Sequence, residues 1–374
     1  MEYKKLGDIA TYINGYPFKP EDRGECGLPI IRIQDLTGNT YDLGYYDGKY
    51  PERIEINNGD ILISWSASLG VYVWNRGKAL LNQHIFKVVF DKVEINKRYF
   101  VYAVQFKLKE MEAKTHGATM KHIVKKDFDS TLIPYPSLKE QSRIAEIIDS
   151  IAKSINMRQK QLQKLDDLVK ARFVELFGTE TELDKWHCGT VSDVADVCVG
   201  VVIKPTQYYT DIGIPAFRSL NIGEMCVKDA DWVYFTEEGH RRNQKSVVRK
   251  NDVLVVRSGA PGTACVASEK YAGYNAVDII IAHPDNNKVN SVFLAAFTNM
   301  PHGMNQIRAK TGGAAQQHFN VGGYKAMRLI MPPIELQEQF AAFVEQTDKS
   351  KAVIQKALDE AQLLFDSLMQ KYFG

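Results

Sequence analysis

The chain repeats itself once, and this repeat constrains the fold more than any other feature of its 374 residues. Short strings recur in the same order in both halves, while the residues between them differ. The matched segments are 6–10 with 191–195, 29–32 with 215–218, 59–63 with 251–255, 114–118 with 310–314, 138–141 with 336–339, and 175–178 with 371–374. Such self-similarity indicates one folding unit used twice. A common frame with different contents is what two reading modules with different targets would have.

Each copy ends in a long helical segment, 138–177 and 335–373. Apolar residues recur at alternating steps of four and three, which is typical of a coiled-coil seam. Eight of ten seam positions are apolar in each segment, and the exceptions are Arg158, Arg172, Thr347 and Lys351. The seam positions are 144, 148, 151, 155, 158, 162, 165, 169, 172 and 176, and then 340, 344, 347, 351, 354, 358, 361, 365, 368 and 372.

Each helix would be about 60 Å long at 1.5 Å per residue, too long for one compact domain to cover. The two helices are therefore predicted to cover each other. Ser137 and Glu140 form the pattern of an N-terminal capping box, and Gly178 that of a C-terminal cap. Arg158 and Arg172 are assigned either to fixing the register or to a partner surface.

The predicted organisation has four parts: a first module at 1–136, a long helix at 137–178, a second module at 179–333 and a long helix at 334–374. Both modules are mixed α/β, because β-rich runs alternate with turn residues and one helical run. Strands are expected at 29–33, 60–64, 71–74, 85–90, 131–133, 215–218, 252–257, 263–267, 277–282 and 329–331, and helices at 97–111 and 291–299. A glycine-containing basic loop is expected at 114–126, and a second glycine-rich basic stretch lies at 307–325.

A mixed module, a Pro-x-x-x-Leu-x-Glu-Gln-type string and a long helix, all repeated, resembles the specificity subunit of a Type I restriction–modification system. The resemblance spans essentially the whole chain. It implies an α+β protein with two homologous target recognition domains, joined by two long antiparallel helices that form an intramolecular coiled coil. It also implies that each domain reads half of a bipartite, asymmetric site in double-stranded DNA. The helices would set the spacer and dock two methyltransferase subunits, with restriction subunits added for cleavage.

The sequence predicts no catalysis and no cofactor in this chain. The nearest string to a methyltransferase motif, Met331-Pro332-Pro333-Ile334, lacks the amide or carboxylate that would hold a target amino group. Nucleotide-binding glycine loops and metal-type histidine spacings are absent. The five cysteines contain no C-x-x-C pair and are interpreted as reduced core thiols. Without a signal core or an 18-residue apolar run, a cytoplasmic protein with no membrane contact is expected.

The net charge of +2 does not by itself indicate a nucleic-acid partner, so a DNA surface must come from local clusters. Residues 97–126 carry eight Lys and Arg against two Glu, and residues 240–257 carry six against one Asp. Lys and Arg neutralise phosphates, while Arg, Asn and Gln read base edges. The candidate DNA-binding residues are Arg32, Gln34, Ser64, Trp65, Ser66, Ser68, Arg76, Asn82, Gln83, His84, Lys114, His116, Thr119, Lys121 and His122 in the first module, and Arg218, Ser219, Asn221, Arg241, Arg242, Arg257, Ser258, Lys310, Thr311, Gln316, Gln317 and His318 in the second.

Structural alternatives stay open for several candidates. Arg32 and Arg218 each follow a strand and would also suit a structural ion pair. Trp65 suits either the core or a stacking platform, and the run at 241–250 suits a solvated face. Landmarks that both copies share are expected to hold phosphates or the frame, whereas positions that diverge, such as Trp65 opposite Arg257, are expected to read sequence.

Two other functions stay open as well. The chain could be a stand-alone DNA-binding or inhibitory mimic of such a subunit, or an enzyme with an unrecognised site. A neighbouring methyltransferase reading frame would favour the specificity subunit. Methylation or cleavage by the isolated chain would favour an enzyme.

Overall fold

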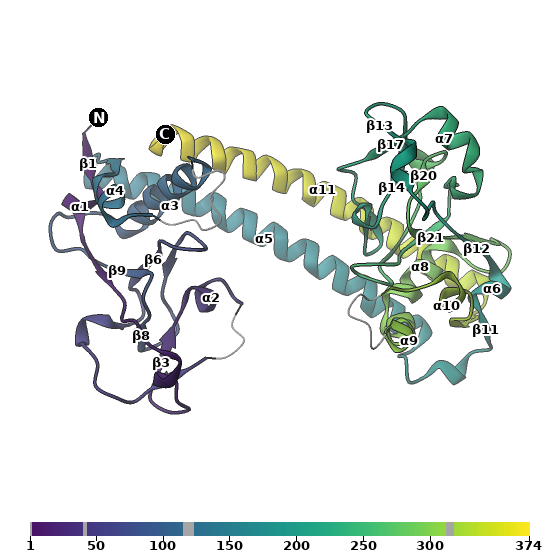
Figure 1. Ribbon diagram of the computed structural model, residues 1–374, viewed down its shortest axis with the longest axis horizontal. Coiled ribbons are helices and arrows are strands. Elements are labelled where there is room, and N and C mark those ends of the chain that lie inside the picture. The colour runs from purple at the N-terminus through teal and green to yellow at the C-terminus, as the bar shows by residue number, and fades with distance from the viewer. Residues whose placement is uncertain (1, 40–42, 115–122, 312–317) are drawn as a thin grey trace. The chain divides into compact units, whose positions relative to one another are not determined.

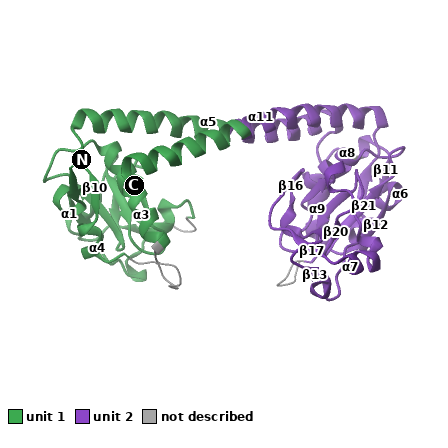
Figure 2. Ribbon diagram, turned by 90° about the horizontal axis from the view of Figure 1, so that it is seen from above, with its two compact units in different colours: residues 1–159, 356–374 green, residues 160–355 purple. Residues whose placement is uncertain are grey.

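A computed structural model describes residues 2–39, 43–114, 123–311 and 318–374. The chain forms two compact units (Figure 2). The first unit contains residues 1–159 and 356–374, and the second contains residues 160–355. Each unit therefore combines one module with parts of both long helices.

The two long helices are α5 (Leu138–Phe177) and α11 (Ile334–Phe373), labelled in Figure 1. Gly178 adopts φ +88° and its N–H donates to the Val174 carbonyl at 2.8 Å, which confirms the predicted C-terminal cap. The predicted capping box forms only in part. The Ser137 hydroxyl accepts from the Glu140 N–H at 3.3 Å, but the Glu140 carboxylate pairs with Arg143 at 2.8 Å instead of turning back to Ser137.

The helices pack along the predicted seam in both units. In the first unit, Ile144 and Ile148 of α5 share a core with Met369 and Phe373 of α11. In the second unit, residues near the end of α5 share a core with residues near the start of α11, namely Val169 and Phe173 with Phe340 and Val344. The beginning of one helix thus meets the end of the other, so the helices are antiparallel. None of the ten predicted seam positions in either helix is exposed.

The polar seam residues have local partners. Arg158 donates to the Ser154 hydroxyl one turn earlier. Arg172 pairs with Glu175 at 2.9 Å, and its guanidinium lies 5.8 Å from the centre of the Phe343 ring. Lys351 pairs with Asp166 across the seam at 2.7 Å. These contacts give both arginines a structural place along the helix pair.

The first module contains two four-stranded sheets, ordered β2-β9-β6-β7 and β4-β3-β8-β5, and the two-stranded sheet β1-β10. In chain order its elements are β1 (Tyr3–Lys5), α1 (Leu6–Ile9), β2 (Thr11–Asn14), β3 (Leu28–Ile31), α2 (Ile33–Leu36), β4 (Tyr45–Tyr46), β5 (Glu55–Ile56), β6 (Ile61–Ser64), β7 (Gly70–Val73), β8 (Ala79–Leu81), β9 (Ile85–Val89), α3 (Lys97–Lys114), α4 (Lys125–Ser130) and β10 (Leu132–Pro134).

The second module repeats this plan with the sheets β12-β21-β18-β19, β13-β17-β14-β20 and β11-β22, and with the short pair β15-β16 added. Its elements are β11 (Cys188–Thr190), α6 (Val191–Val194), β12 (Ala195–Val199), β13 (Tyr209–Thr210), β14 (Ile214–Phe217), β15 (Ile222–Gly223), β16 (Cys226–Val227), β17 (Val233–Phe235), α7 (Glu237–Arg242), β18 (Val253–Val256), β19 (Ala264–Val266), β20 (Asn275–Ala276), β21 (Ile279–Pro284), α8 (Ser291–Asn299), α9 (Pro301–Thr311), α10 (Val321–Lys325) and β22 (Arg328–Ile330).

Register confirms that the two modules are copies. Ile31 pairs in parallel with Leu81, as Phe217 does with Ala276. The inner strands β6 and β18 each lie between two antiparallel neighbours. In each module, one helix packs against the end of the long helix that follows the other module. This helix is α3 in the first module and α8 in the second. The rings of Tyr99 (α3) and Phe373 are 5.2 Å apart, and those of Phe293 (α8) and Phe177 are 4.8 Å apart.

Two sequence expectations are wrong. Residues 114–126 were expected to be a loop, but α3 extends to Lys114 and α4 begins at Lys125. In the glycine-rich stretch 307–325, α9 extends to Thr311 and α10 occupies Val321–Lys325. The Asn320 side chain caps α10 by accepting from the Gly323 N–H at 2.7 Å. The cysteines are unpaired, but they are not all core thiols, because Cys26 and Cys226 are exposed and only Cys265 is buried.

Candidate nucleic-acid interface

The strongest candidate site lies where the inner strand of each module ends. Ser64 of β6 pairs with Ile85, and Val256 of β18 pairs with Ile279. The next residues, Trp65 and Arg257, therefore occupy the same place, as the sequence repeat predicts. Their carbonyls accept equivalent main-chain bonds, from Ile123 to Trp65 and from Phe319 to Arg257, both at 2.9 Å.

Trp65 is half-buried in the first module and packs against two other rings. Its indole stacks on Phe86 with ring centres 5.5 Å apart and an interplanar angle of 22°. The His84 ring meets its edge at 4.9 Å, and Nε1 donates to Asn14 Oδ1 at 3.3 Å. His84 has φ +72°, which few non-glycine residues adopt. Trp65 thus belongs partly to the core, and it is held rigidly at the strand end.

Arg257 carries a different constellation at the same place in the second module. Its side chain is only 9% exposed, and Nη1 bonds Asp278 Oδ1 at 2.6 Å. Nε donates to the Phe319 carbonyl at 3.2 Å, and Nη2 lies 2.5 Å from His318 Nε2. The other ring nitrogen of His318 meets the Ser258 hydroxyl at 2.7 Å. Each of the three Arg257 side-chain nitrogens therefore has a partner within the chain, and the partly or fully exposed groups around it are Asp278, Ser258 and His318.

Arg32 and Arg218 belong to the frame. The Arg32 N–H donates to Asp35 Oδ2 at 2.8 Å, and the Arg218 N–H donates to Asn221 Oδ1 at 2.9 Å. Asp35 and Asn221 are buried. The Arg32 guanidinium pairs with Asp35 at 3.3 Å, and that of Arg218 donates to the Asp231 carbonyl. This geometry favours the structural alternative for both arginines and places Asn221 in the core rather than at a base edge.

Other first-module candidates vary in exposure. Ser64 is fully buried and donates to the Ser68 carbonyl at 2.5 Å, and Ser66 is buried beside it. Ser68 is exposed, as is Arg76, whose guanidinium bonds the Asp35 carbonyl at 2.7 Å and lies over Trp74. Half-buried positions are Gln34, Asn82 and Gln83.

The remaining second-module candidates lie on three segments. Thr311 is buried and bonds the Ile307 carbonyl of its own helix at 3.1 Å, while Lys310 donates to the Gly323 carbonyl at 2.9 Å. Ser219 is half-buried. Arg241 and Arg242 are exposed on α7, and Arg242 pairs with Glu238 at 2.5 Å.

Several candidates fall outside what the structure describes. They are His116, Thr119, Lys121, His122, Gln316 and Gln317, together with the side chain of Lys114. The described residues that follow them include Ile123 and Phe319, whose main-chain N–H groups bond to Trp65 and Arg257 at the strand ends. The DNA contacts of these candidates stay predictions.

Part of the basic surplus at 97–126 is neutralised locally. Lys107 pairs with Glu110 at 2.9 Å, Lys125 pairs with Asp129 at 2.6 Å, and Arg98 pairs with Asp149. This stretch therefore presents less free positive charge than its composition suggests. Sequence reasoning also missed Asn14 and Asp278. The repeat could have flagged Asp278, because it takes the place of His84, whereas no sequence signal marks Asn14.

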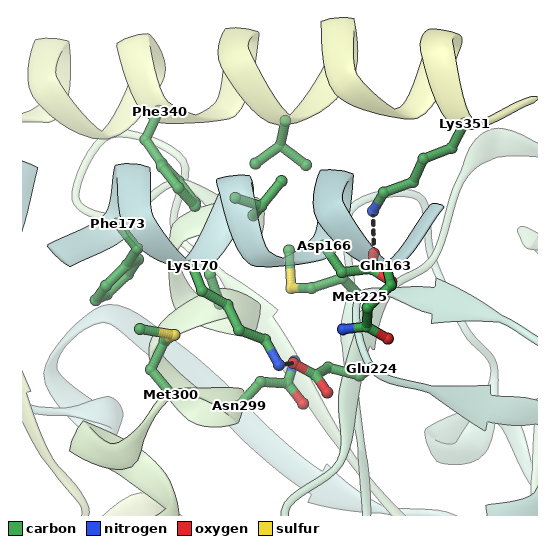
Figure 3. A pocket seen from close by; sticks show the side chains of 13 residues that line it. Gln163, Asp166, Lys170, Phe173, Glu224, Met225, Asn299, Met300, Phe340 and Lys351 are labelled. Carbon is green, nitrogen blue, oxygen red and sulfur yellow. Dashed lines mark ion pairs between the residues drawn. The ribbon is translucent and has the colours of Figure 1, made fainter. Parts of the chain in front are cut away.

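A cavity of about 160 Å³ lies between the helix pair and the second module (Figure 3). Phe173, Phe340 and Met300 line it, and the ion pairs Lys170–Glu224 at 2.8 Å and Lys351–Asp166 at 2.7 Å edge it. A hollow in the first unit lies between α3 and α11 and is lined by residues including Phe106, Phe365 and Met369. Each unit thus has one recess at a place where a helix of the module packs against a long helix.

In the described part of the chain, no helix is long and apolar enough to cross a membrane. Across the same residues, no three or more His, Cys, Asp and Glu side chains gather as a metal site would require.

Two copies of a mixed α/β module, each followed by a long helix, place the chain in a class of duplicated two-module proteins. The chain belongs to the family described as the Type I restriction modification DNA specificity domain, whose model matches residues 1–167 and 184–362. This membership confirms the predicted resemblance.

Relatives extend over nearly the whole chain. The Type I restriction enzyme EcoBI specificity subunit of Escherichia coli is 25% identical, with 98% of this chain and 84% of that protein covered. The StySPI specificity subunit of Salmonella potsdam is 24% identical, with 98% and 86% covered. Both names agree with the prediction of a specificity subunit rather than an enzyme.

Solved structures share the fold. The S subunit of a Type I restriction–modification system from M. genitalium matches with a TM-score of 0.57 and 16% identity, covering 100% of this chain and 96% of that one. A chain from a study of complex assembly in the type I system matches with a TM-score of 0.52 and 14% identity, covering 100% and 97%. The predicted fold class is confirmed.

Proposed function

We propose that this chain is the DNA-specificity subunit of a Type I restriction–modification complex and that its two modules read different halves of one bipartite, asymmetric site. One observation carries the proposal. The same place on the same frame holds Trp65 with His84 in one module and Arg257 with Asp278 and His318 in the other. A cluster of aromatic rings and a cluster of charged, hydrogen-bonding groups contact bases differently, so the two modules would recognise different sequences.

The helix pair supports a role as spacer. Both helices run without interruption for 40 residues, and each holds a module at either end through the aromatic contacts of Phe177 and Phe373. In this role the helices fix the gap between the half-sites, about one turn of DNA.

The outer faces of the helices suit partner subunits. Apolar side chains that a lone protein would tend to bury are exposed there, namely Met157, Leu168, Val353, Leu363 and Leu364. The two recesses suit two copies of one partner. We assign these surfaces to two methyltransferase subunits, with restriction subunits joining that assembly and with no membrane involved.

The test is co-expression with the neighbouring methyltransferase, followed by mapping of methylated positions in genomic DNA. The expected result is a two-part motif with an unspecified gap. Co-purification without methylation would favour an inhibitory mimic, and methylation by the isolated chain would refute a non-catalytic role. Substituting Leu168 and Val353 together by Ser should weaken co-purification, whereas substituting Lys164 and Lys349 by Ser should leave it unchanged.

A further inference from the structure

Three side chains in the second module form a relay outside the candidate interface. Cys198 lies on β12, His283 on the neighbouring strand β21, and Asp252 just before β18. Cys198 Sγ is 3.7 Å from His283 Nε2, and His283 Nδ1 is 2.6 Å from Asp252 Oδ1. Cys198 is opposite Ile281 in the ladder, two residues from His283, so both side chains share one face of the sheet.

The carboxylate at the base of this relay is fixed. Asp252 is 2% exposed, and its second oxygen accepts the Arg249 N–H at 2.6 Å. The hydrogen bond that His283 donates to Asp252 is the main cause that raises the pKa of His283 to about 9, and the contact with Cys198 adds to it. At neutral pH the imidazole is therefore a cation whose Nε2–H faces the sulfur. The Cys198 thiol also donates to the main-chain carbonyl of Lys245 at 3.2 Å, and the Lys245 side chain is exposed.

Cys198 is half-buried and its sulfur lies 3.7 Å from the imidazole of His283, and reactive cysteines typically lie beside such a cationic group. We propose that Cys198, activated by His283 and positioned through Asp252, is a modification site for soft electrophiles and peroxides. With hydrogen peroxide, the thiolate sulfur attacks one oxygen, the O–O bond breaks and hydroxide leaves. The sulfur is oxidised to the sulfenic acid while the peroxide is reduced.

The other cysteines provide internal comparisons. Cys26 is exposed, but its thiol donates to Asp47 at 3.4 Å, and this bond raises its pKa. Cys226 is exposed as a residue, but its sulfur is partly buried, and this burial raises its pKa. Burial raises the pKa of Cys265 to about 12. Cys188 is the cysteine whose reactivity could rival that of Cys198, because the Arg328 guanidinium bonds it. That guanidinium also pairs with Asp184 at 2.9 Å, so its charge is shared.

The test is limited alkylation of the full chain with iodoacetamide, followed by quantitative peptide mass spectrometry of all five cysteines. At near-neutral pH we expect Cys198 to react about tenfold faster than the more exposed Cys26. His283→Gln should remove this advantage. A sulfenic-acid trap after peroxide treatment should label Cys198, and Cys198→Ser should abolish that label.

Faster reaction at Cys26, Cys188 or Cys226 would overturn the proposal, and so would an unchanged rate at Cys198 in His283→Gln. Continued protection of Cys265 in that variant shows that the module is still folded. If Cys265 becomes reactive, Asp252→Asn replaces the variant, because it keeps the shape of the relay and removes its charge.

Discussion

The side-chain amide of Gln141 accepts the main-chain N–H of Asn96 at 2.9 Å, and Gln337 accepts that of Asn290 at the same distance. Each glutamine also donates to the proline carbonyl five residues earlier. Asn96 and Asn290 in turn cap α3 and α8. Gln141 therefore corresponds in the structure to Gln337, two residues before Gln339, with which the sequence repeat aligned it. Each of these glutamines locks the start of a long helix to the first helix of its module.

Replacing either glutamine by Ala should destabilise the protein. Both side chains are buried, so the substitution leaves unsatisfied main-chain groups, at a cost of about 1–3 kcal/mol each. Denaturant unfolding measures this loss. Gln339→Ala, at an exposed position of the same string, is the matched control and should change little. Equal effects at all three positions would mean that the lock contributes nothing.

Asp278→Asn should change recognition of the second half-site only. The substitution keeps the shape of the side chain but weakens its bond to Arg257, which releases the guanidinium and His318. Discrimination at one or more bases should fall by about 1–3 kcal/mol. Methylation mapping would show relaxed positions on one side of the gap. Asp285→Asn, exposed in the same module, should leave the motif intact.

Trp65→Leu should produce the reciprocal result. It removes the ring that stacks on Phe86 and meets His84, so the first half-site should lose discrimination while the second is unchanged. A change in both half-sites would contradict independent reading by the two modules.

Lengthening the helix pair should change the gap and neither half-site. Duplicating residues 153–159 of α5 together with 358–364 of α11 keeps the seam in phase. Seven helical residues add about 10 Å, or about three base pairs. The methylated motif should then contain a longer gap between unchanged halves. Altered half-site bases with an unchanged gap would refute the spacer role.

The relay at His283 makes the stability of the second module depend on pH. Because folding raises the pKa of His283 from 6.5 to about 9, the folded state binds its proton more tightly. This stabilisation is fully present below about pH 6.5 and is lost as the pH rises through about 9. Unfolding curves of the wild type and His283→Gln should therefore converge at alkaline pH. A constant difference across that range would exclude the linkage.

Sequence reasoning predicted long-period features best. The seams of α5 and α11 emerge from many residues at fixed spacing, and the helix ends were placed at or within one residue of those observed. Arg32 and Arg218 show which features could not be predicted from the sequence. Their roles depend on Asp35 and Asn221, three residues away and buried only after the chain folds into a short turn. Arg257 likewise looked free to read bases, because its partners Asp278 and His318 are distant in sequence.

In each unit the start of one long helix packs against the end of the other, and this arrangement has a consequence for biosynthesis. The core of the first unit includes Phe373, which contacts Tyr99 and Phe106. A ribosome that has completed residue 178 has therefore released a module whose apolar face on α3 still lacks its cover. That face stays open while nearly 200 more residues are translated, at about 5–20 residues per second. The nascent chain is thus most prone to aggregation or to chaperone capture between its two halves, and its first half folds last.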